Sequence, residues 1–203
     1  MDQKVVPIIL IALAMLISFN LGYLLLPSPK AISFSAPAIG SLGKGSLIDF
    51  EMRITQGSGK TLVNIQNADF KEDVENALRK ARFNADRYLG ISSGHFDISL
   101  SVKGEGNMVS GESAGGMFAV AIVALATGRE LRNDVIISAV ILENGNLEEV
   151  GGIEEKIIAA KEGKRNVFLV SSGQKIKDEQ EVTQGIRIIR VRNLEEAVKY
   201  LLK

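Results

Sequence analysis

The chain has 203 residues, of which 46% are hydrophobic and 24% are charged, a balance typical of a folded protein with a sizeable core. Its 24 basic and 24 acidic residues cancel, so the composition gives no basic surplus for nucleic acid and no acidic excess for a basic partner. Because the chain has no cysteine and one histidine, a structural zinc site or an iron–sulfur cluster is all but excluded.

The first long apolar segment covers residues 5–26, which are 22 consecutive positions without a charged side chain. A transmembrane helix needs about 20 such residues, whereas the apolar part of a cleaved signal peptide is usually about 7–15 residues long. We therefore predict an uncleaved single-pass membrane anchor over residues 5–26, with a signal peptide as the alternative. Lys4 and Lys30 nearly cancel under the positive-inside rule, so the membrane face stays open, with the extracytoplasmic side favoured.

After this segment the composition turns to Ser, Pro, Ala and Gly, which predicts a linker over residues 27–45. The remaining residues, 46–203, are enough chain for one domain. Residues 47–55 and 61–67 have the pattern of strands, and the glycine-rich segment 57–60 between them predicts a hairpin.

The spacing of apolar residues predicts a helix over residues 70–88, and alternation predicts a strand over residues 96–102. Residues 113–127 are nearly all small or apolar and too few to span a bilayer, so they should form a buried central helix. Asn144-Gly145 predicts a hairpin turn between strands at residues 135–142 and 147–150. The later elements are predicted as a helix from Ile153, strands at residues 167–170 and 186–191, and a helix from Leu194. This mixed order indicates an α+β or α/β fold.

Lys156 falls on the margin of the apolar stripe that Ile153, Ile157 and Ala160 form on their helix. One interpretation is a lysine whose stem lies along the edge of the core while its ammonium reaches water. The other is a desolvated amine, because burial disfavours the charged form and lowers the pKa of a lysine. Only a neutral amine can take a proton, so a lysine that acts as a general base needs such surroundings.

Ser113 is predicted at the start of the apolar helix, where one interpretation is an ordinary helix cap. The alternative is a nucleophile placed among unpaired backbone N–H groups at the positive end of the helix dipole. Such N–H groups stabilise the oxyanion of a tetrahedral intermediate. Gly111, Gly115 and Gly116 would then allow a substrate backbone to approach closely.

Taken together, residues 96–164 resemble the proteolytic domain of the Lon protease family, whose members use a Ser–Lys dyad. The serine of that family lies in a Gly-x-Ser-Ala-Gly context, which matches residues 111–115, and its lysine follows a Gly-Gly-Ile/Leu-x-Glu-Lys pattern, which matches residues 151–156. The resemblance implies that Ser113 and Lys156 are catalytic and that Ser138 supports the lysine. It also extends upstream over residues 47–90 and implies the mixed-sheet, α+β fold of that domain.

Three features depart from the family pattern. Glu112 stands where proline is frequent, and pairing with Lys156 would raise the pKa of the lysine and hold it protonated. Ser99 and Ser101 replace upstream histidines. We also expect no ATPase module in this chain, because Gly59-Lys60-Thr61 is not a phosphate loop: Ile54 stands where such a loop needs its first glycine.

We therefore predict a membrane-anchored, ATP-independent serine endopeptidase of unfolded polypeptides, without metal, cofactor, nucleotide or nucleic acid. The backbone N–H groups of Glu112, Ser113 and Ala114 are the expected oxyanion donors. The resemblance implies a homo-oligomer, with a hexameric ring as the default. Two alternatives stay open: a non-catalytic, membrane-tethered assembly module with the same fold, and a peptidase subunit fed by a separate ATPase.

Overall fold

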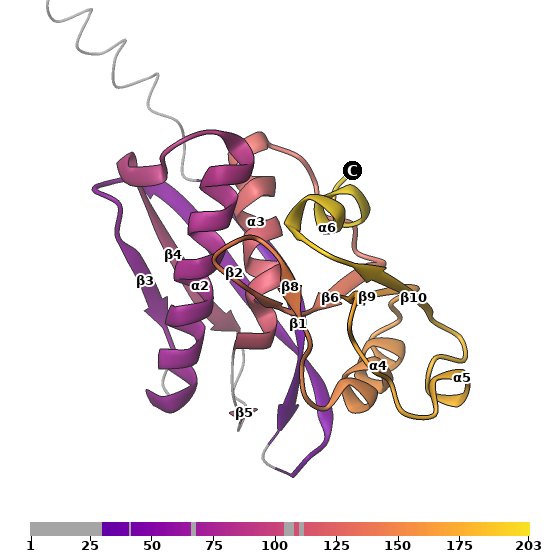
Figure 1. Cartoon of the computed structure of the whole chain (residues 1–203). Coiled ribbons are helices and arrows are strands. Elements are labelled where there is room, and N and C mark those ends of the chain that lie inside the picture. The colour runs from indigo at the N-terminus through magenta and orange to yellow at the C-terminus, as the bar shows by residue number, and fades with distance from the viewer. Residues whose placement is uncertain (1–29, 41, 66–67, 104–107, 110–111) are drawn as a thin grey trace, which may run out of the picture. The chain divides into compact units, whose positions relative to one another are not determined.

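The computed structural model describes residues 30–203, apart from residues 41, 66–67, 104–107 and 110–111. Residues 31–203 form one compact unit. Figure 1 shows the elements in chain order: β1 (Lys30–Gly40), β2 (Gly45–Gln56), β3 (Thr61–Asn64), α2 (Ala68–Leu89), η1 (Ser93–His95), β4 (Phe96–Lys103), β5 (Met108–Val109), η2 (Glu112–Ala114), α3 (Gly115–Thr127), β6 (Val135–Ser138), β7 (Val140–Ile141), β8 (Leu147–Glu148), α4 (Ile153–Glu162), β9 (Val167–Ser171), α5 (Glu179–Val182), β10 (Arg187–Val191) and α6 (Leu194–Leu201).

A five-stranded sheet in the order β3-β4-β2-β1-β5 forms one half of the unit. β2 pairs with β4 in antiparallel register from Asp49 opposite Lys103 to Gln56 opposite Phe96. β3 pairs with β4 in parallel, so β4 lies between β2 and β3. The predicted hairpin between β2 and β3 is therefore wrong, because two strands joined by a short loop need not be neighbours once a later strand pairs with both.

β1 occupies much of the segment that was predicted as a linker. Its alternate residues Phe34, Ala36 and Ala38 are buried, and the Phe34 ring stacks on Phe50 with centroids 5.6 Å apart. The linker prediction is wrong over residues 30–40. Serine and proline are typical of loops, but the buried residues along this segment pack it against the core as a strand.

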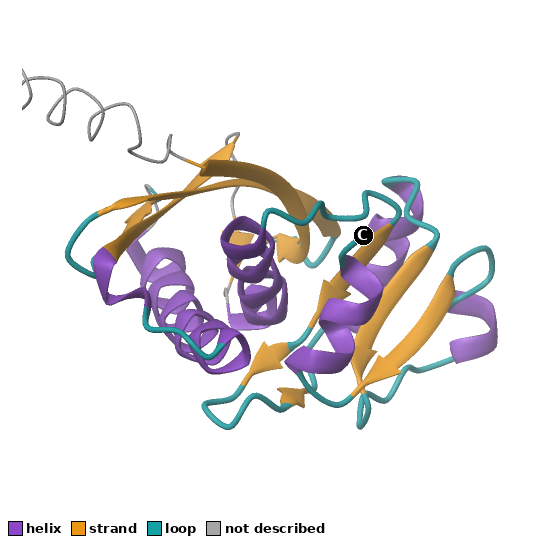
Figure 2. Cartoon of the chain, turned by 90° about the horizontal axis from the view of Figure 1, so that it is seen from above, coloured by secondary structure: helices purple, strands orange, loops and turns teal. Residues whose placement is uncertain are grey.

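The main core lies between this sheet and helices α2 and α3, which Figure 2 shows side by side on one face of the strands. Residues 115–125 of α3 are all buried, which confirms the predicted buried central helix. Phe118 from this helix meets Phe34 and Phe50 edge-on, with ring centroids 6.1 Å and 5.2 Å away. Such edge-to-face packing adds to the stabilisation that burial of the rings provides.

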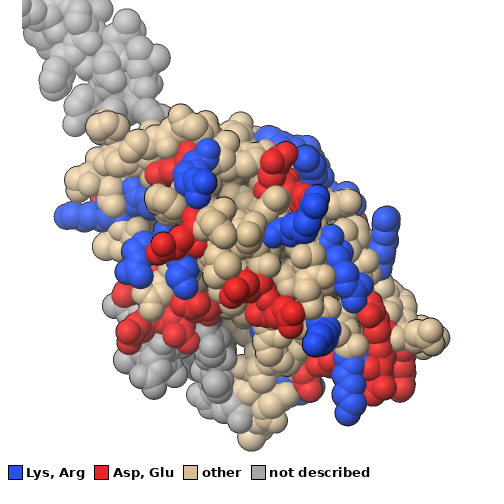
Figure 3. Space-filling model, in the orientation of Figure 1, with Lys and Arg blue, Asp and Glu red and all other residues tan. Residues whose placement is uncertain are grey.

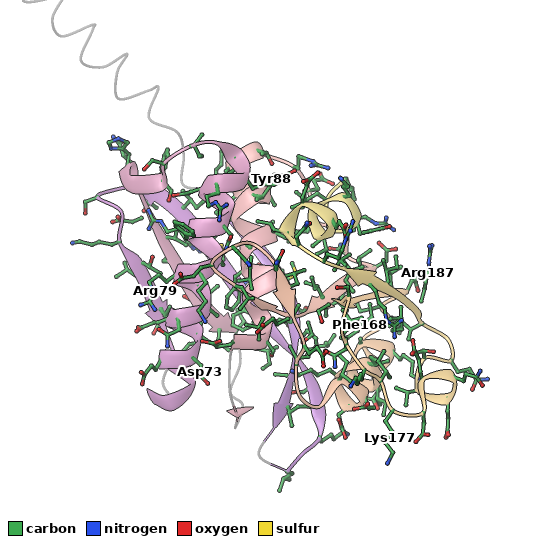
Figure 4. The ribbon with its side chains drawn as sticks, viewed as in Figure 1. Asp73, Arg79, Tyr88, Phe168, Lys177 and Arg187 are labelled. Carbon is green, nitrogen blue, oxygen red and sulfur yellow. The ribbon has the colours of Figure 1, made fainter. Side chains whose placement is uncertain are left out.

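A second sheet has three parallel strands in the order β10-β9-β6. Ile136, Phe168 and Val170 belong to a core cluster shared with α4, whereas Ile137 and Leu169 belong to the main core. Because successive residues of a strand point to opposite faces, α4 covers one face of this sheet and α3 with α6 cover the other. Figure 4 marks Phe168 on β9.

The predicted strand at residues 135–142 is two strands in different sheets. β6 ends at Ser138 and pairs in parallel with β9, whereas β7 begins at Val140 and pairs antiparallel with β8. The hairpin turn between β7 and β8 is confirmed: the side chain of Asn144 accepts a hydrogen bond from the Asn146 N–H, and Gly145 has a positive φ of 87°.

Arg82 of α2 ties the loops around β3 and β4 together. Its guanidinium donates hydrogen bonds to the carbonyls of Gly59 (2.8 Å), Ser93 (2.5 Å) and Phe96 (2.9 Å). The Asp97 carboxylate accepts from the Lys60 N–H at 2.8 Å. The segment that imitates a phosphate loop is thus a fixed connection between β2 and β3.

Among the described residues, no helix is long and apolar enough to cross a membrane. The predicted anchor at residues 5–26 lies outside the described residues. Basic and acidic side chains are interspersed on the face shown in Figure 3, in keeping with the formal net charge of +0.

Candidate active site

Ser113 lies in η2, a one-turn 3-10 helix that leads directly into α3, and its side chain is partly exposed. The residue that caps α3 is Ala114, and no side chain caps this helix. The structure therefore removes the interpretation of Ser113 as the helix cap. Within the described part of the chain, no hydrogen bond involves its hydroxyl group.

The backbone of Ser113 is attached to the junction between β6 and β7. Its carbonyl accepts hydrogen bonds from the Ala139 N–H at 3.0 Å and from the Ser138 hydroxyl at 3.5 Å. The Gly116 N–H returns a bond to the Ala139 carbonyl at 3.1 Å. These bonds fix the start of α3 against the end of β6.

Two of the glycines around Ser113 lie in close contact with the neighbouring strands. A Cβ atom on Gly115 would lie 3.0 Å from the Ile141 side chain, and one on Gly116 would lie 3.3 Å from the Ile137 side chain. Close helix–strand packing therefore requires glycine at both positions, and their role in admitting substrate stays a prediction. Gly111 lies outside the described residues.

Lys156 lies in the first turn of α4 between Ile153 and Ile157, and it is only 4% exposed. Burial lowers the pKa of its ammonium from 10.5 to about 8, because the charged form loses hydration. Among the described residues, the Lys156 amine forms no ion pair and no hydrogen bond, including with Ser113. The structure favours the desolvated amine over a lysine that reaches water.

Ser138 marks the end of β6 at which the segments that carry Ser113 and Lys156 come together. It is fully buried and lies two residues after Ile136, so it points to the face of the sheet that α4 covers. After α4 ends, the Asn166 N–H bonds to the Asp134 carbonyl, at the opposite end of β6. The first turn of α4, with Lys156, consequently begins at the Ser138 end, where the Ser113 carbonyl is bound.

Glu112 does not pair with Lys156. Its carboxylate oxygens lie 3.1 Å and 3.2 Å from the Lys80 amine on α2. The pairing that would raise the pKa of Lys156 is thus absent from the described structure, and burial is the cause of its lowered pKa.

Two further residues hold the start of α4 and the segment that leads into it, and sequence spacing reveals neither of them. The buried side chain of Gln174 accepts from the Val150 N–H at 2.9 Å and donates to the Val150 carbonyl at 3.2 Å. Gly45 at the start of β2 is pressed against α4, so that a Cβ atom there would lie 2.0 Å from the Glu155 carbonyl oxygen. Each contact joins residues far apart in the chain, which is why sequence spacing does not reveal it.

Residues 37–203 match the family model of the Lon protease (S16) C-terminal proteolytic domain. The chain belongs to the Lon protease family. Its relatives include Lon protease 2 of Syntrophobacter fumaroxidans, 38% identical over 121 residues, which are 58% of this chain and 15% of that protein. Lon protease 2 of Herpetosiphon aurantiacus is 28% identical over 175 residues, covering 82% of this chain and 21% of the relative. Lon protease of Haemophilus influenzae is 28% identical over 167 residues, covering 78% and 20%.

The chain therefore spans about a fifth or less of the length of these Lon relatives. The match confirms the family that the two motifs indicated, and the mixed α+β architecture fits a Lon proteolytic domain. Ser113, Ser138 and Lys156 all fall inside the matched residues. A serine peptidase is the class of activity that this family supports.

Proposed function

We propose that this Lon-family domain is a serine endopeptidase in which Ser113 is the nucleophile and Lys156 is the general base. The observation that carries the proposal is the burial of Lys156, without a charged partner in the described structure, at the end of β6 to which Ser113 is bonded. With its pKa lowered to about 8, this amine releases its proton more than two pH units below an ordinary lysine, which a base requires.

In the proposed reaction, neutral Lys156 takes the hydroxyl proton of Ser113 as Oγ attacks the peptide carbonyl. The backbone N–H groups of Glu112, Ser113 and Ala114 stabilise the oxyanion, and removal of one such donor typically costs about 3–4 kcal/mol. The Lys156 ammonium then protonates the leaving amine, and a water molecule repeats the cycle on the acyl-enzyme. Ser138 is proposed to orient the amine, as the third group does in other triads.

We further propose that the substrates are peptides or unfolded segments and that cleavage needs no nucleotide. A hexameric ring, a membrane anchor at residues 5–26 and an extracytoplasmic domain complete the proposal. The alternative of an ATPase in a separate chain is tested by adding nucleotide and by affinity capture: recovery of an ATPase, or turnover of a folded substrate only with ATP, would favour it.

A non-catalytic assembly module is the main competing function. It drew its support from a salt bridge between Glu112 and Lys156 that would disable the base. Because Glu112 instead pairs with Lys80, that support is lost.

The test uses the purified full chain with casein and with a fluorogenic peptide. Ser113→Ala and Lys156→Met should each lower kcat at least about a thousandfold, since each removes one member of a unit that acts together. Lys161→Met on the same helix and Ser101→Ala on β4 are matched controls. Equal turnover by all variants would refute the peptidase proposal. For the active protein, kcat/KM should rise with pH through a midpoint of about 8.

A further inference from the structure

The carboxylate that directly precedes Ser113 is a hazard to a neutral lysine base. An anion close to a buried amine favours the ammonium and raises its pKa. Glu112 is only partly exposed, with 36% of its side chain accessible, so water screens its charge incompletely. A cation beside this carboxylate would offset its effect on the proposed base.

Lys80 supplies the opposite charge. Its amine lies 3.1 Å and 3.2 Å from the two carboxylate oxygens of Glu112, and its own side chain is 25% accessible. Both partners come from elements with fixed backbones, because α2 packs against η2 and the Ser113 carbonyl is bound to Ala139.

Asn84 fixes the turn of α2 that carries Lys80. It is 3% exposed, and its side-chain amide donates to the Lys80 carbonyl at 2.8 Å and to the Leu142 carbonyl at 2.7 Å. The segment from Ala139 to Leu142 therefore binds both the turn of α2 that carries Lys80 and the backbone of Ser113. These bonds fix the two sides of the ion pair relative to each other.

The other acidic groups near Lys156 are engaged or directed elsewhere. On α4 itself, the Glu154 carboxylate accepts from the Lys177 N–H, and Glu155 and Glu162 are exposed. On β2, Asp49 accepts from the Ser35 hydroxyl, and Glu51 forms ion pairs with Arg53 and Lys103. On α5, Glu179 forms an ion pair with Arg190, and Glu181 is exposed. β6 carries no charged residue. None of these carboxylates forms an ion pair with Lys156 in the described residues.

We propose that Lys80 is a positioning residue of the site: its ammonium holds and neutralises the Glu112 carboxylate and so leaves the Lys156 amine free to take the proton of Ser113. This inference rests on the proposed peptidase function. Lys80 acts through Glu112 and does not touch the reacting atoms.

The consequence of removing Lys80 is a change in pH dependence rather than a uniform loss. Lys80→Met leaves Glu112 charged and unpaired, which shifts the midpoint of the kcat/KM profile to higher pH, by about one pH unit for a partly shielded charge nearby. At pH 8 this shift lowers the neutral fraction of Lys156 from about one half to about one tenth, so turnover falls roughly fivefold and recovers at higher pH.

The experiment is a double-mutant cycle in the full chain with Lys80→Met, Glu112→Gln and both together, and Lys80→Arg as the conservative control. Two readouts are measured against pH: kcat/KM for a fluorogenic peptide, and the 13C chemical shift of the Lys156 ε-carbon in lysine-labelled protein, assigned with Lys156→Met. The second readout reports the titration of Lys156 whether or not the protein cleaves peptides.

We expect Lys80→Met alone to move both midpoints upward, and Glu112→Gln in the same chain to move them back, while Lys80→Arg retains the original midpoints. An unchanged 13C midpoint in Lys80→Met, or an equal shift with and without Glu112, would overturn the role of Lys80. If Ser113→Ala leaves turnover unchanged, the peptidase proposal fails, and the 13C titration still decides whether Lys80 shields Lys156.

Discussion

A buried lysine that keeps a lowered pKa should make the folded protein less stable at neutral pH. Lys156 is 4% exposed, and its pKa is lowered from 10.5 to about 8 by the loss of hydration. A gap of about 2.5 pH units between the folded and unfolded pKa values corresponds to about 3 kcal/mol of unfolding free energy. We therefore predict that Lys156→Met, which keeps a long apolar side chain, stabilises the protein by up to about 3 kcal/mol at pH 7.

The sign of the pH dependence follows from which state binds the proton. Below about pH 8 Lys156 is protonated in both states, and the folded state bears the full cost of the buried ammonium. Between about pH 8 and 10.5 the folded state has released the proton while the unfolded state keeps it, so stability rises with pH. The advantage of Lys156→Met should consequently shrink to less than about 1 kcal/mol near pH 10.5.

Urea unfolding of the full chain, followed by circular dichroism at pH 7 and pH 10.5, measures this difference. Lys161→Met, on the same helix and half-exposed, is the control for loss of a lysine from α4. A Lys156→Met protein that is less stable than the wild type at pH 7, or whose advantage is the same at both pH values, would refute the desolvation argument.

Three further substitutions test contacts that hold the site and its scaffold. Arg82→Met should lower the unfolding free energy by about 2–4 kcal/mol, measured by urea denaturation, because several carbonyls lose their donor at once; no change would contradict its bridging role. Gly45→Ala should displace the first turn of α4 and lower peptide turnover more than Gly94→Ala does, since the added Cβ meets the Glu155 carbonyl at Gly45 but only an ordinary contact at Gly94. Gln174→Leu leaves the Val150 N–H and carbonyl without partners, so a loss of about 1–3 kcal/mol in thermal unfolding is expected; a loss no greater than that of exposed Gln184→Leu would argue against this contact.

Local pattern was sufficient to predict the elements that carry the candidate site. The uniform apolar character of residues 113–127 predicts a helix buried on all sides, and α3 is such a helix. The stripe formed by Ile153 and Ile157 places Lys156 at the edge of the core, and the structure buries it further. Each of these features depends on neighbours within a few turns of the same helix.

Features that depend on distant partners were predicted poorly. The break between β6 and β7 at Ala139 has no local signal, because both strands are apolar and the parallel partner β9 comes much later in the chain. The same holds for Lys80 and Glu112, which are 32 positions apart and meet only when α2 packs beside η2. Sequence spacing showed the acid next to Ser113 but not the cation that neutralises it.

The attachment of the Ser113 carbonyl to the strand junction at Ala139 has a consequence for heat inactivation. The serine cannot swing away while α3 stays packed, so a folded form with a misplaced hydroxyl should be scarcely populated. Peptide turnover and folded structure should then be lost at the same temperature. The rate of heat inactivation would be set by the unfolding rate of the whole domain.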